Sequence, residues 1–140
     1  MLRHNSLYTP ETHPVVAIDL DSTIWTEDYP YFGEPFSGAI STINEMFKVG
    51  YDVIIWTSRG GGNLDTCIDH LREVHDLNSE IKFNAHSKIF TDKYPSSSPK
   101  IGASIYIDDK AYGAPESFEN EWGTLAKKFL GRVIYDRYGK

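Results

Sequence analysis

The sequence predicts an α/β fold in which a central parallel sheet lies between two layers of helices, a three-layer α/β/α sandwich. Three apolar runs support this prediction, at 15–18, 53–56 and 103–107. Continuous runs rich in Val and Ile are typical of strands that are covered on both faces, as parallel strands usually are. Segments with helical periodicity alternate with these runs, and strands that alternate with helices favour a parallel sheet with right-handed crossovers.

The segments between the strands are expected to form helices. The first helix is expected between Ser37 and Gly50, because its apolar residues recur every three or four positions and glycine commonly ends a helix. A second helix follows the glycines at 60–62 and carries Cys67 on its apolar stripe, so this cysteine is expected to pack in the core. A third helix is expected around 122–129, with further short strands at 81–84 and 132–135.

Length and composition indicate a single cytoplasmic domain. The 140 residues fit one domain, assigned here to 14–140 after a loose N-terminal tail at 1–13. The 14 basic and 20 acidic residues give a net charge of −6, which disfavours nucleic acid and anionic membranes as partners. The single cysteine excludes an internal disulfide and fits a reducing compartment. No apolar stretch reaches the ~20 residues of a membrane span, and the polar start does not resemble a secretory signal.

Acidic and hydroxyl side chains follow the expected strands at the point where each strand ends. They are Asp19 and Asp21 after the first run, Thr57 after the second, and Asp108 and Asp109 after the third. Ligand sites of open α/β sheets lie at the carboxyl ends of the strands, so we expect these side chains to share one site. Carboxylates commonly hold Mg²⁺ together with substrate phosphate. Lys100 and Arg59 are expected to supply positive charge to a phosphoryl group there.

Taken together, these residues resemble the four motifs of the haloacid dehalogenase (HAD) superfamily of phosphohydrolases. The segment 19–23, Asp-Leu-Asp-Ser-Thr, is similar to the first motif, Thr57 to the second, Lys100 to the third, and Asp108-Asp109 to the fourth. The resemblance extends from about Val15 to Gly113 and is closest to small capless bacterial and phage members. Ser22 departs from the pattern, because most of the superfamily has glycine there. The implied fold is the Rossmann-like core of that superfamily.

The resemblance implies a Mg²⁺-dependent phosphatase that hydrolyses a small phosphomonoester, such as a nucleotide or sugar phosphate, through an aspartyl phosphate. Asp19 is the implied nucleophile and Asp21 the proton carrier, with Thr57 and Lys100 completing the catalytic set. The implied Mg²⁺ ligands are Asp19, the backbone carbonyl of Asp21, and one of Asp108 and Asp109, between which the sequence does not decide. Contacts to substrate and phosphate are expected from Thr23, Ser58, Arg59, Trp25 and Tyr29.

The intervals between the motifs leave no room for a cap domain. The segment 25–36, in which aromatic residues alternate with Pro and Gly, is expected to form a loop or small hairpin, called the flap below. Substrate selection would fall to the aromatic residues of the flap and to a long loop at 86–99. An open site admits a large substrate, or a small one if a neighbouring subunit closes it, so a homo-oligomer stays open as a possibility.

Three other functions are alternatives. The open site also fits a phosphatase that acts on nucleic-acid ends or phosphoproteins, although the net charge disfavours nucleic acid. A receiver module that accepts phosphate on an aspartate also uses acids, a Thr and a Lys, but in receivers the acid pair comes first and the Lys last. A module that binds metal and phosphate without chemistry is disfavoured, because every catalytic residue type is present.

Overall fold

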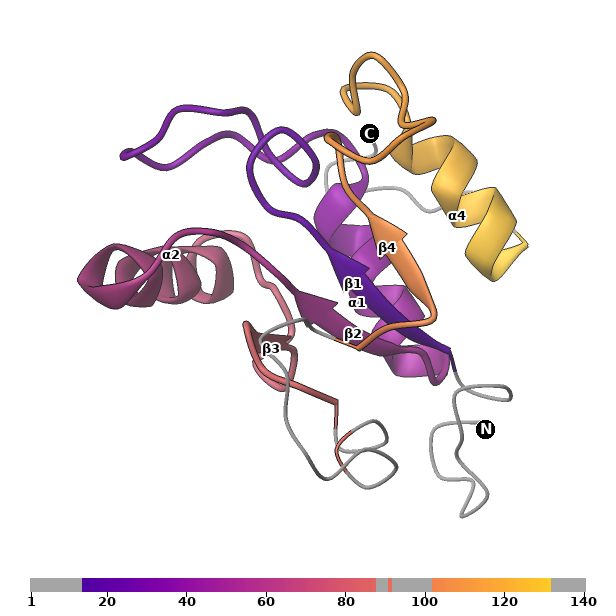
Figure 1. Cartoon of the computed structure of the whole chain (residues 1–140), viewed down its shortest axis with the longest axis horizontal. Coiled ribbons are helices and arrows are strands. Elements are labelled where there is room, and N and C mark those ends of the chain that lie inside the picture. Colours follow the sequence, from indigo (N-terminus) through magenta and orange to yellow (C-terminus); the bar gives the residue numbers. More distant parts are fainter. Residues whose placement is uncertain (1–13, 88–90, 92–101, 132–140) are drawn as a thin grey trace.

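A four-stranded sheet forms the centre of the molecule. Its strands are β1 (Val15–Ile18), β2 (Asp52–Ile55), β3 (Lys82–Phe83) and β4 (Ile105–Ile107). They lie in the order β3-β2-β1-β4, and each neighbouring pair is parallel (Figure 1). The structure is a computed structural model that describes residues 14–87, 91 and 102–131. It confirms the prediction of an α/β fold with a central parallel sheet. The expected tail at 1–13 and the strand at 132–135 lie outside the described residues.

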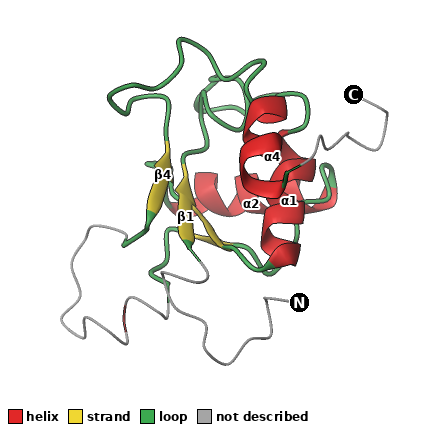
Figure 2. Ribbon diagram, turned by 90° about the vertical axis from the view of Figure 1, so that its right-hand side faces the viewer, coloured by secondary structure: helices red, strands yellow, loops and turns green. Residues whose placement is uncertain are grey.

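Three helices pack on one face of this sheet, as Figure 2 shows from the side. They are α1 (Ala39–Val49), α2 (Gly61–Glu73) and α4 (Trp122–Leu130). Their buried residues form one core with the side chains of Val16, Ile18, Val53 and Ile55. The opposite face carries a smaller apolar cluster of Val15, Ala17 and Ile54, against which Trp56 and Ala103 pack. Strand β1 is therefore buried on both faces, as its continuous apolar sequence predicted.

The helix boundaries follow from glycines more than from polar caps. Helix α1 begins after Gly38, not at Ser37, and Gly38 has a φ of 80°, in the left-handed region that glycine tolerates. The helix ends at Gly50, as predicted, where the backbone N–H of Gly50 bonds to carbonyls of the last turn. In α2 the thiol of Cys67 is buried in the core, which confirms its expected place. Within the described part of the chain, no helix is both long enough and apolar enough to cross a bilayer.

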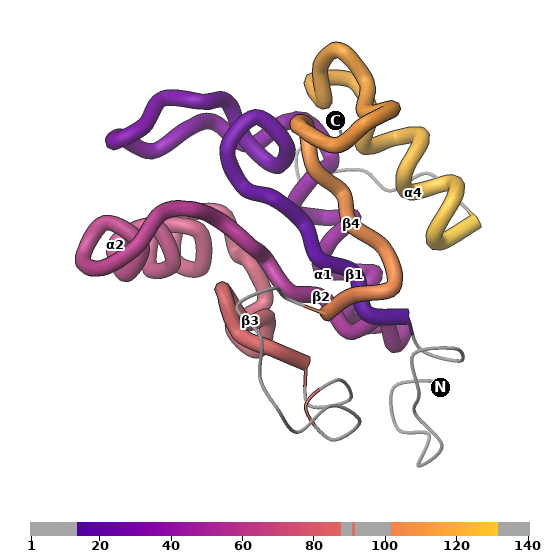
Figure 3. Tube along the Cα trace, in the orientation of Figure 1, coloured from indigo at the N-terminus to yellow at the C-terminus, as the bar shows by residue number. Residues whose placement is uncertain are grey.

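The carboxyl ends of three strands bring their following segments to one edge of the sheet. Figure 3 shows the segment after β1, in indigo and purple, and the segment after β4, in orange, rising on the same side of the sheet. The backbone N–H of Asp19 donates to the carbonyl of Ile107 at 2.9 Å, which continues the β1–β4 pairing into this edge. On the other side of β1, the N–H of Trp56 donates to the carbonyl of Ile18 at 2.8 Å. The segments that follow β1, β2 and β4 therefore begin beside one another at this edge of the sheet.

Candidate functional site

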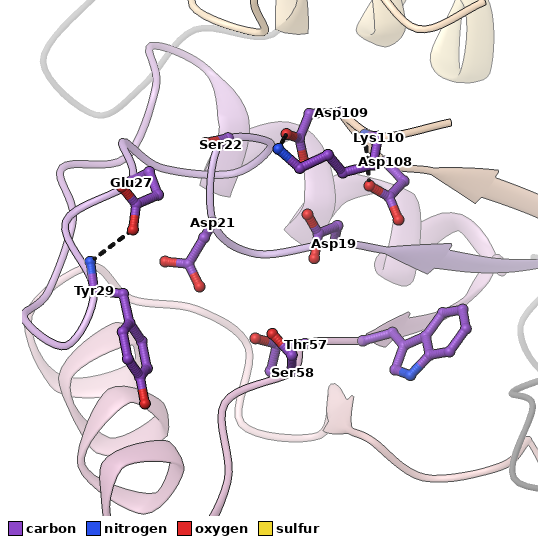
Figure 4. A pocket seen from close by; sticks show the side chains of 11 residues that line it. Asp19, Asp21, Ser22, Glu27, Tyr29, Thr57, Ser58, Asp108, Asp109 and Lys110 are labelled. Atoms are coloured by element: carbon purple, nitrogen blue, oxygen red, sulfur yellow. Dashed lines mark hydrogen bonds and ion pairs between the residues drawn. The ribbon is translucent and has the colours of Figure 1, made fainter. Parts of the chain in front are cut away.

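A cavity of about 600 Å³ opens at this edge of the sheet (Figure 4). Its size falls within the range of about 300–1,000 Å³ that is usual for small-molecule sites. It is lined by Asp19, Asp21, Ser22, Glu27, Tyr29, Trp56, Thr57, Ser58, Asp108, Asp109 and Lys110. The cavity therefore brings together residues from the ends of β1, β2 and β4 and from the flap.

Three of the lining carboxylates form a cluster, which we call the acidic cluster: Asp19, Asp108 and Asp109. Each offers an oxygen that lies within 4.8 Å of the others. Asp19 comes from the end of β1, and the Asp108-Asp109 pair follows β4, so the parallel pairing of these two strands creates the cluster. The backbone N–H of Lys110 donates to Asp108 at 2.9 Å and fixes that carboxylate. Carboxylate oxygens at these separations can hold a divalent cation, since such ions take oxygen ligands.

The carboxylates of the acidic cluster repel one another, and a proton on one of them reduces this repulsion. The pKa of Asp19 is raised to about 8, first by burial, then by its hydrogen bond with Asp109 and by the negative charge of Asp108. Burial also raises the pKa of Asp109, but hydrogen bonds from Asp19, Thr23 and Lys110 outweigh it and the net shift is downward. Without a cation the proton therefore resides on Asp19. A bound cation would remove the reason for that proton, because it favours the charged form of each ligand.

Thr23 supports the acidic cluster from behind, where the sequence predicted a contact to phosphate. Its side chain is fully buried and does not line the cavity. The Thr23 hydroxyl accepts the backbone N–H of Asp109 at 3.0 Å, and it lies 3.2 Å from Oδ1 of Asp109 and 3.4 Å from Oδ2 of Asp19. The structure therefore places the Thr23 hydroxyl between two acids of the cluster, and its expected contact to phosphate stays a prediction.

Asp21 lies only two residues from Asp19, yet its side chain points elsewhere. The chain turns at Ser22, between Asp21 and Trp25. Ser22 has a φ of 67°, a left-handed backbone conformation that glycine adopts most easily. Arg59 binds the Asp21 carboxylate with two N–H groups, at 2.8 and 3.0 Å, and the indole N–H of Trp25 donates to it at 2.9 Å. The Asp21 side chain is thus not part of the acidic cluster. Only its backbone carbonyl stays available for the metal role that the HAD resemblance implied.

Arg59 uses its guanidinium to join three parts of the protein. Besides Asp21, it donates to the carbonyls of Pro30 and Tyr31 in the flap, to Oδ1 of Asn63, and to the thiol of Cys67 in α2. Arg59 is 3% exposed and does not line the cavity. The pKa of Arg59 is raised, chiefly by the hydrogen bonds to Asp21. The structure uses the Arg59 donors inside the protein, and the expected contact between Arg59 and phosphate stays a prediction.

Trp25 and Tyr29, the two flap residues expected to contact substrate, have different positions. Trp25 is fully buried, and its ring packs near the Arg59 guanidinium at 5.5 Å. It belongs to the core, and its expected contact to substrate stays a prediction. Tyr29 lines the cavity with 60% of its surface exposed. The flap therefore presents one of these two rings to a ligand.

Thr57 and Ser58 line the cavity opposite Asp19, as Figure 4 shows. The Thr57 hydroxyl accepts the backbone N–H of Arg59 at 3.1 Å, and no described group accepts its own hydrogen. Asn84 holds the Thr57 backbone on both sides, since it accepts the Thr57 N–H and donates to the Thr57 carbonyl, both at 2.8 Å. The two hydroxyl residues are thus arranged to donate to an anion in the cavity.

Sequence reasoning missed four residues of this site: Glu27, Asn84, Trp56 and Lys110. Trp56 directly precedes Thr57, and Lys110 directly follows Asp109. Their places in the chain, next to motif residues, could therefore have predicted that they lie at the site. Glu27 lies in a loop, and Asn84 follows the short strand β3. In neither place does a periodic sequence pattern indicate which way a side chain points. Lys100, the expected cationic residue, and most of the loop at 86–99 lie outside the described residues.

Comparison with known proteins supports the fold. The chain is similar to a solved structure of a conserved protein from Bacteroides thetaiotaomicron, with a TM-score of 0.66 and 26% sequence identity. The match covers 83% of this chain and 92% of that protein. No family model matches the chain, and no curated protein matches it.

Proposed function

We propose that the protein is a Mg²⁺-dependent phosphatase that hydrolyses a phosphomonoester through an aspartyl phosphate on Asp19. The observation that carries this proposal is the acidic cluster, in which Asp19 meets Asp108 and Asp109 at the floor of an open cavity. The order of motifs along the chain, which resembles that of the HAD superfamily, supports it independently. Fold alone would not, because one fold serves many functions.

The residues of the cluster fit a magnesium ion. Three carboxylates converge, and the pKa of Asp19 is raised first by burial, then by its hydrogen bond with Asp109 and by the negative charge of Asp108. Lys110 contributes little, since its ammonium lies 3.5 Å from Asp109 on a side chain that is 87% exposed. Bound there, Mg²⁺ would act as a Lewis acid that reduces the repulsion between Asp19 and an incoming phosphate.

Asp19 would act as the nucleophile in the first half of the reaction. One carboxylate oxygen forms a bond to phosphorus while the bond from phosphorus to the ester oxygen breaks, and the departing oxygen takes a proton from Asp21. For this step Asp21 must be protonated, with one of its hydrogen bonds from Arg59 or Trp25 released. The hydroxyls of Thr57 and Ser58 donate to the phosphoryl oxygens from the other side of the cavity. Both hydroxyl residues line the cavity, and Asn84 keeps the Thr57 backbone in place.

Asp21 would act as the base in the second half. Water attacks the phosphorus of the aspartyl phosphate, Asp21 takes a proton from that water, and the bond from phosphorus to Asp19 breaks to release inorganic phosphate. The same proton is then available for the next departing ester oxygen. Three donors from Arg59 and Trp25 hold Asp21 as a hydrogen-bond acceptor, which suits the removal of a proton from water.

The test is turnover of p-nitrophenyl phosphate with Mg²⁺ and with a chelator in its place. Hydrolysis should require the ion and should be lost in Asp19→Asn and in Asp108→Asn. Asp69→Asn is the matched control, because Asp69 is an exposed acid on α2 far from the cavity lining. Unchanged turnover in Asp19→Asn would exclude the covalent route. Release of many phosphates per chain would exclude a receiver module, which stops at one.

A further inference from the structure

The part of the cavity beyond Asp21 is built differently from the acidic cluster. Figure 4 shows Asp21 between Asp19 and a second region that is formed by Tyr29 and Glu27 of the flap. A phosphoryl group attacked by Asp19 releases its ester oxygen on the far side of phosphorus, where the proton carrier must lie. Under the proposed function, the departing alcohol therefore lies on the Asp21 side, next to Tyr29 and Glu27.

Tyr29 is held as a fixed surface in this region. The Arg59 guanidinium lies over one face of its ring, 5.1 Å from the ring centre. The backbone N–H of Tyr29 donates to the Glu27 carboxylate at 3.1 Å, which restrains the flap at this point (Figure 4). Arg59 is itself buried and bound to two flap carbonyls. With one face against Arg59 and 60% of the residue exposed, Tyr29 offers its other face to a ligand.

The other aromatic residues of the flap do not share this position. The flap lies wholly within the described residues, and of its aromatic side chains only Tyr29 lines the cavity. Phe32 stacks on His70 of α2 at 4.0 Å between ring centres, and Trp25 is buried. Tyr31 is 70% exposed but lies outside the cavity lining. A ring on the ligand would thus meet one protein ring here.

The charges of the cavity restrict what else the alcohol can carry. Its lining holds the carboxylates of Asp19, Asp21, Glu27, Asp108 and Asp109, against the ammonium of Lys110 among the described residues. Arg59 neutralises Asp21, and a divalent ion would offset the acidic cluster, but Glu27 has no cationic partner among the described contacts. A second phosphate on the alcohol would approach the exposed Glu27 carboxylate, so the repulsion between them is modest and greatest at low salt.

From this arrangement we infer that the substrate is the monophosphate ester of an alcohol that carries a planar aromatic or heteroaromatic ring and no second phosphate, with the ring stacked on Tyr29. This inference rests on the proposed phosphatase function and adds the class of substrate to it. Offset stacking between aromatic rings contributes binding beyond simple burial, and a nucleobase or an aryl ring satisfies it equally.

The experiment compares benzyl phosphate with cyclohexylmethyl phosphate, whose alcohols are similarly acidic but whose rings are flat and puckered respectively. The unmodified protein should hydrolyse the benzyl ester with a kcat/KM about three- to tenfold higher. Tyr29→Leu should bring this ratio close to one, while Tyr29→Phe should keep it because the ring remains. Tyr31→Leu is the matched control, since it removes a flap ring outside the cavity and should leave the ratio unchanged.

The charge requirement has its own comparison. Adenosine 5′-monophosphate should be a better substrate than adenosine 3′,5′-bisphosphate, and Glu27→Gln should reduce this difference because it removes the repelling carboxylate. Turnover of all esters with equal kcat/KM for benzyl and cyclohexylmethyl phosphate would overturn the ring inference and leave the phosphatase proposal standing. A ratio that survives Tyr29→Leu would do the same. Absence of turnover with every ester would overturn both.

Discussion

Asp19 and Asp21 stand two positions apart in the chain, yet the fold gives them opposite surroundings. Asp19 faces Asp108 and Asp109, and its pKa is raised to about 8, first by burial and then by these acids. Asp21 faces Arg59 and Trp25, which donate three hydrogen bonds to its carboxylate. Negative charge is thus uncompensated on one side of the cavity and fully paired on the other. An added cation could therefore bind on the Asp19 side, whereas the Asp21 side already has Arg59.

The two sides should also differ in whether a mutation changes mainly activity or mainly folding. Under the proposed function the Asp19 side binds an added ion, and the protein should gain stability when that ion binds. The paired side already contains its cation in Arg59, which also binds the flap and α2. Changes at Asp19 should therefore alter activity more than folding, while changes at Arg59 should alter folding first.

The largest expected effect is on activity, from Asp19→Asn. If Asp19 is the nucleophile, as proposed, its loss should reduce kcat for p-nitrophenyl phosphate by at least about a thousandfold. The metal-free variant should be no less stable than the unmodified protein at pH 8 and above, because the amide cannot ionise beside Asp108 and Asp109. Activity assays and urea denaturation with a chelator present measure the two quantities. A clear loss of stability without metal at pH 8 and above would contradict the uncompensated charge that we assign to this side.

The next largest effect is on stability, from Arg59→Met. This change leaves Asp21 without its ion pair and deprives the flap carbonyls of their donors, so unfolding should require about 3 kcal/mol less. Lys128→Met is the control, since Lys128 is exposed on α4 and should change stability by less than about 0.5 kcal/mol. Urea denaturation at one pH and one salt concentration measures both. A loss below about 1 kcal/mol would mean that the pair behaves as a surface ion pair.

The sequence predicted one side of this comparison better than the other. Parallel strands place their carboxyl ends at one edge, so Asp19, Asp21, Asp108 and Asp109 were expected to meet. The oxygens of Asp19, Asp108 and Asp109 do converge, and the Asp21 side chain does not join them. The core positions of β1 and the end of α1 at Gly50 also followed from local patterns. Each of these features depends on the repeat of a strand or a helix, and that repeat can be recognised in the order of apolar and polar residues.

The pairing of Asp21 with Arg59 could not be predicted in the same way. It depends on the direction of side chains after the strand has ended, where Ser22 at a φ of 67° turns the chain. Arg59 likewise lies in the irregular segment between β2 and α2, and its partners come from the flap and from α2. A positive charge beside a phosphate site was the simpler expectation, and the buried position of Arg59 and its partners within the protein were not foreseen.

A smaller effect should appear in the pH dependence of stability without metal. Since the pKa of Asp19 is raised from 3.8 to about 8, the folded protein binds more protons than the unfolded chain between these values, and stability should fall as pH rises from about 5 to 8. Burial lowers the pKa of His75, which acts in the opposite direction near neutral pH. The informative quantity is therefore the difference between the unmodified protein and Asp19→Asn, in which the contribution of His75 cancels.

Magnesium should reverse this trend. Ligands bind the ion as carboxylates, so saturating Mg²⁺ should stabilise the unmodified protein more at pH 8 than at pH 5. Urea denaturation at several pH values, with Mg²⁺ or with a chelator, gives both curves. Equal stabilisation at pH 5 and pH 8 would indicate that the ion binds away from Asp19.

The smallest effect compares two buried threonines, Thr23 and Thr42, that differ only in their partners. The Thr23 hydroxyl accepts the N–H of Asp109 and contacts its carboxylate, whereas the Thr42 hydroxyl is buried without a hydrogen-bond partner. Thr23→Val should therefore cost about 1–2 kcal/mol and weaken Mg²⁺ binding about tenfold, because one acid of the cluster loses its support. Thr42→Val should be neutral or stabilising, since it removes an unpaired polar atom. Equal costs for the two changes would show that Thr23 serves only to fill space.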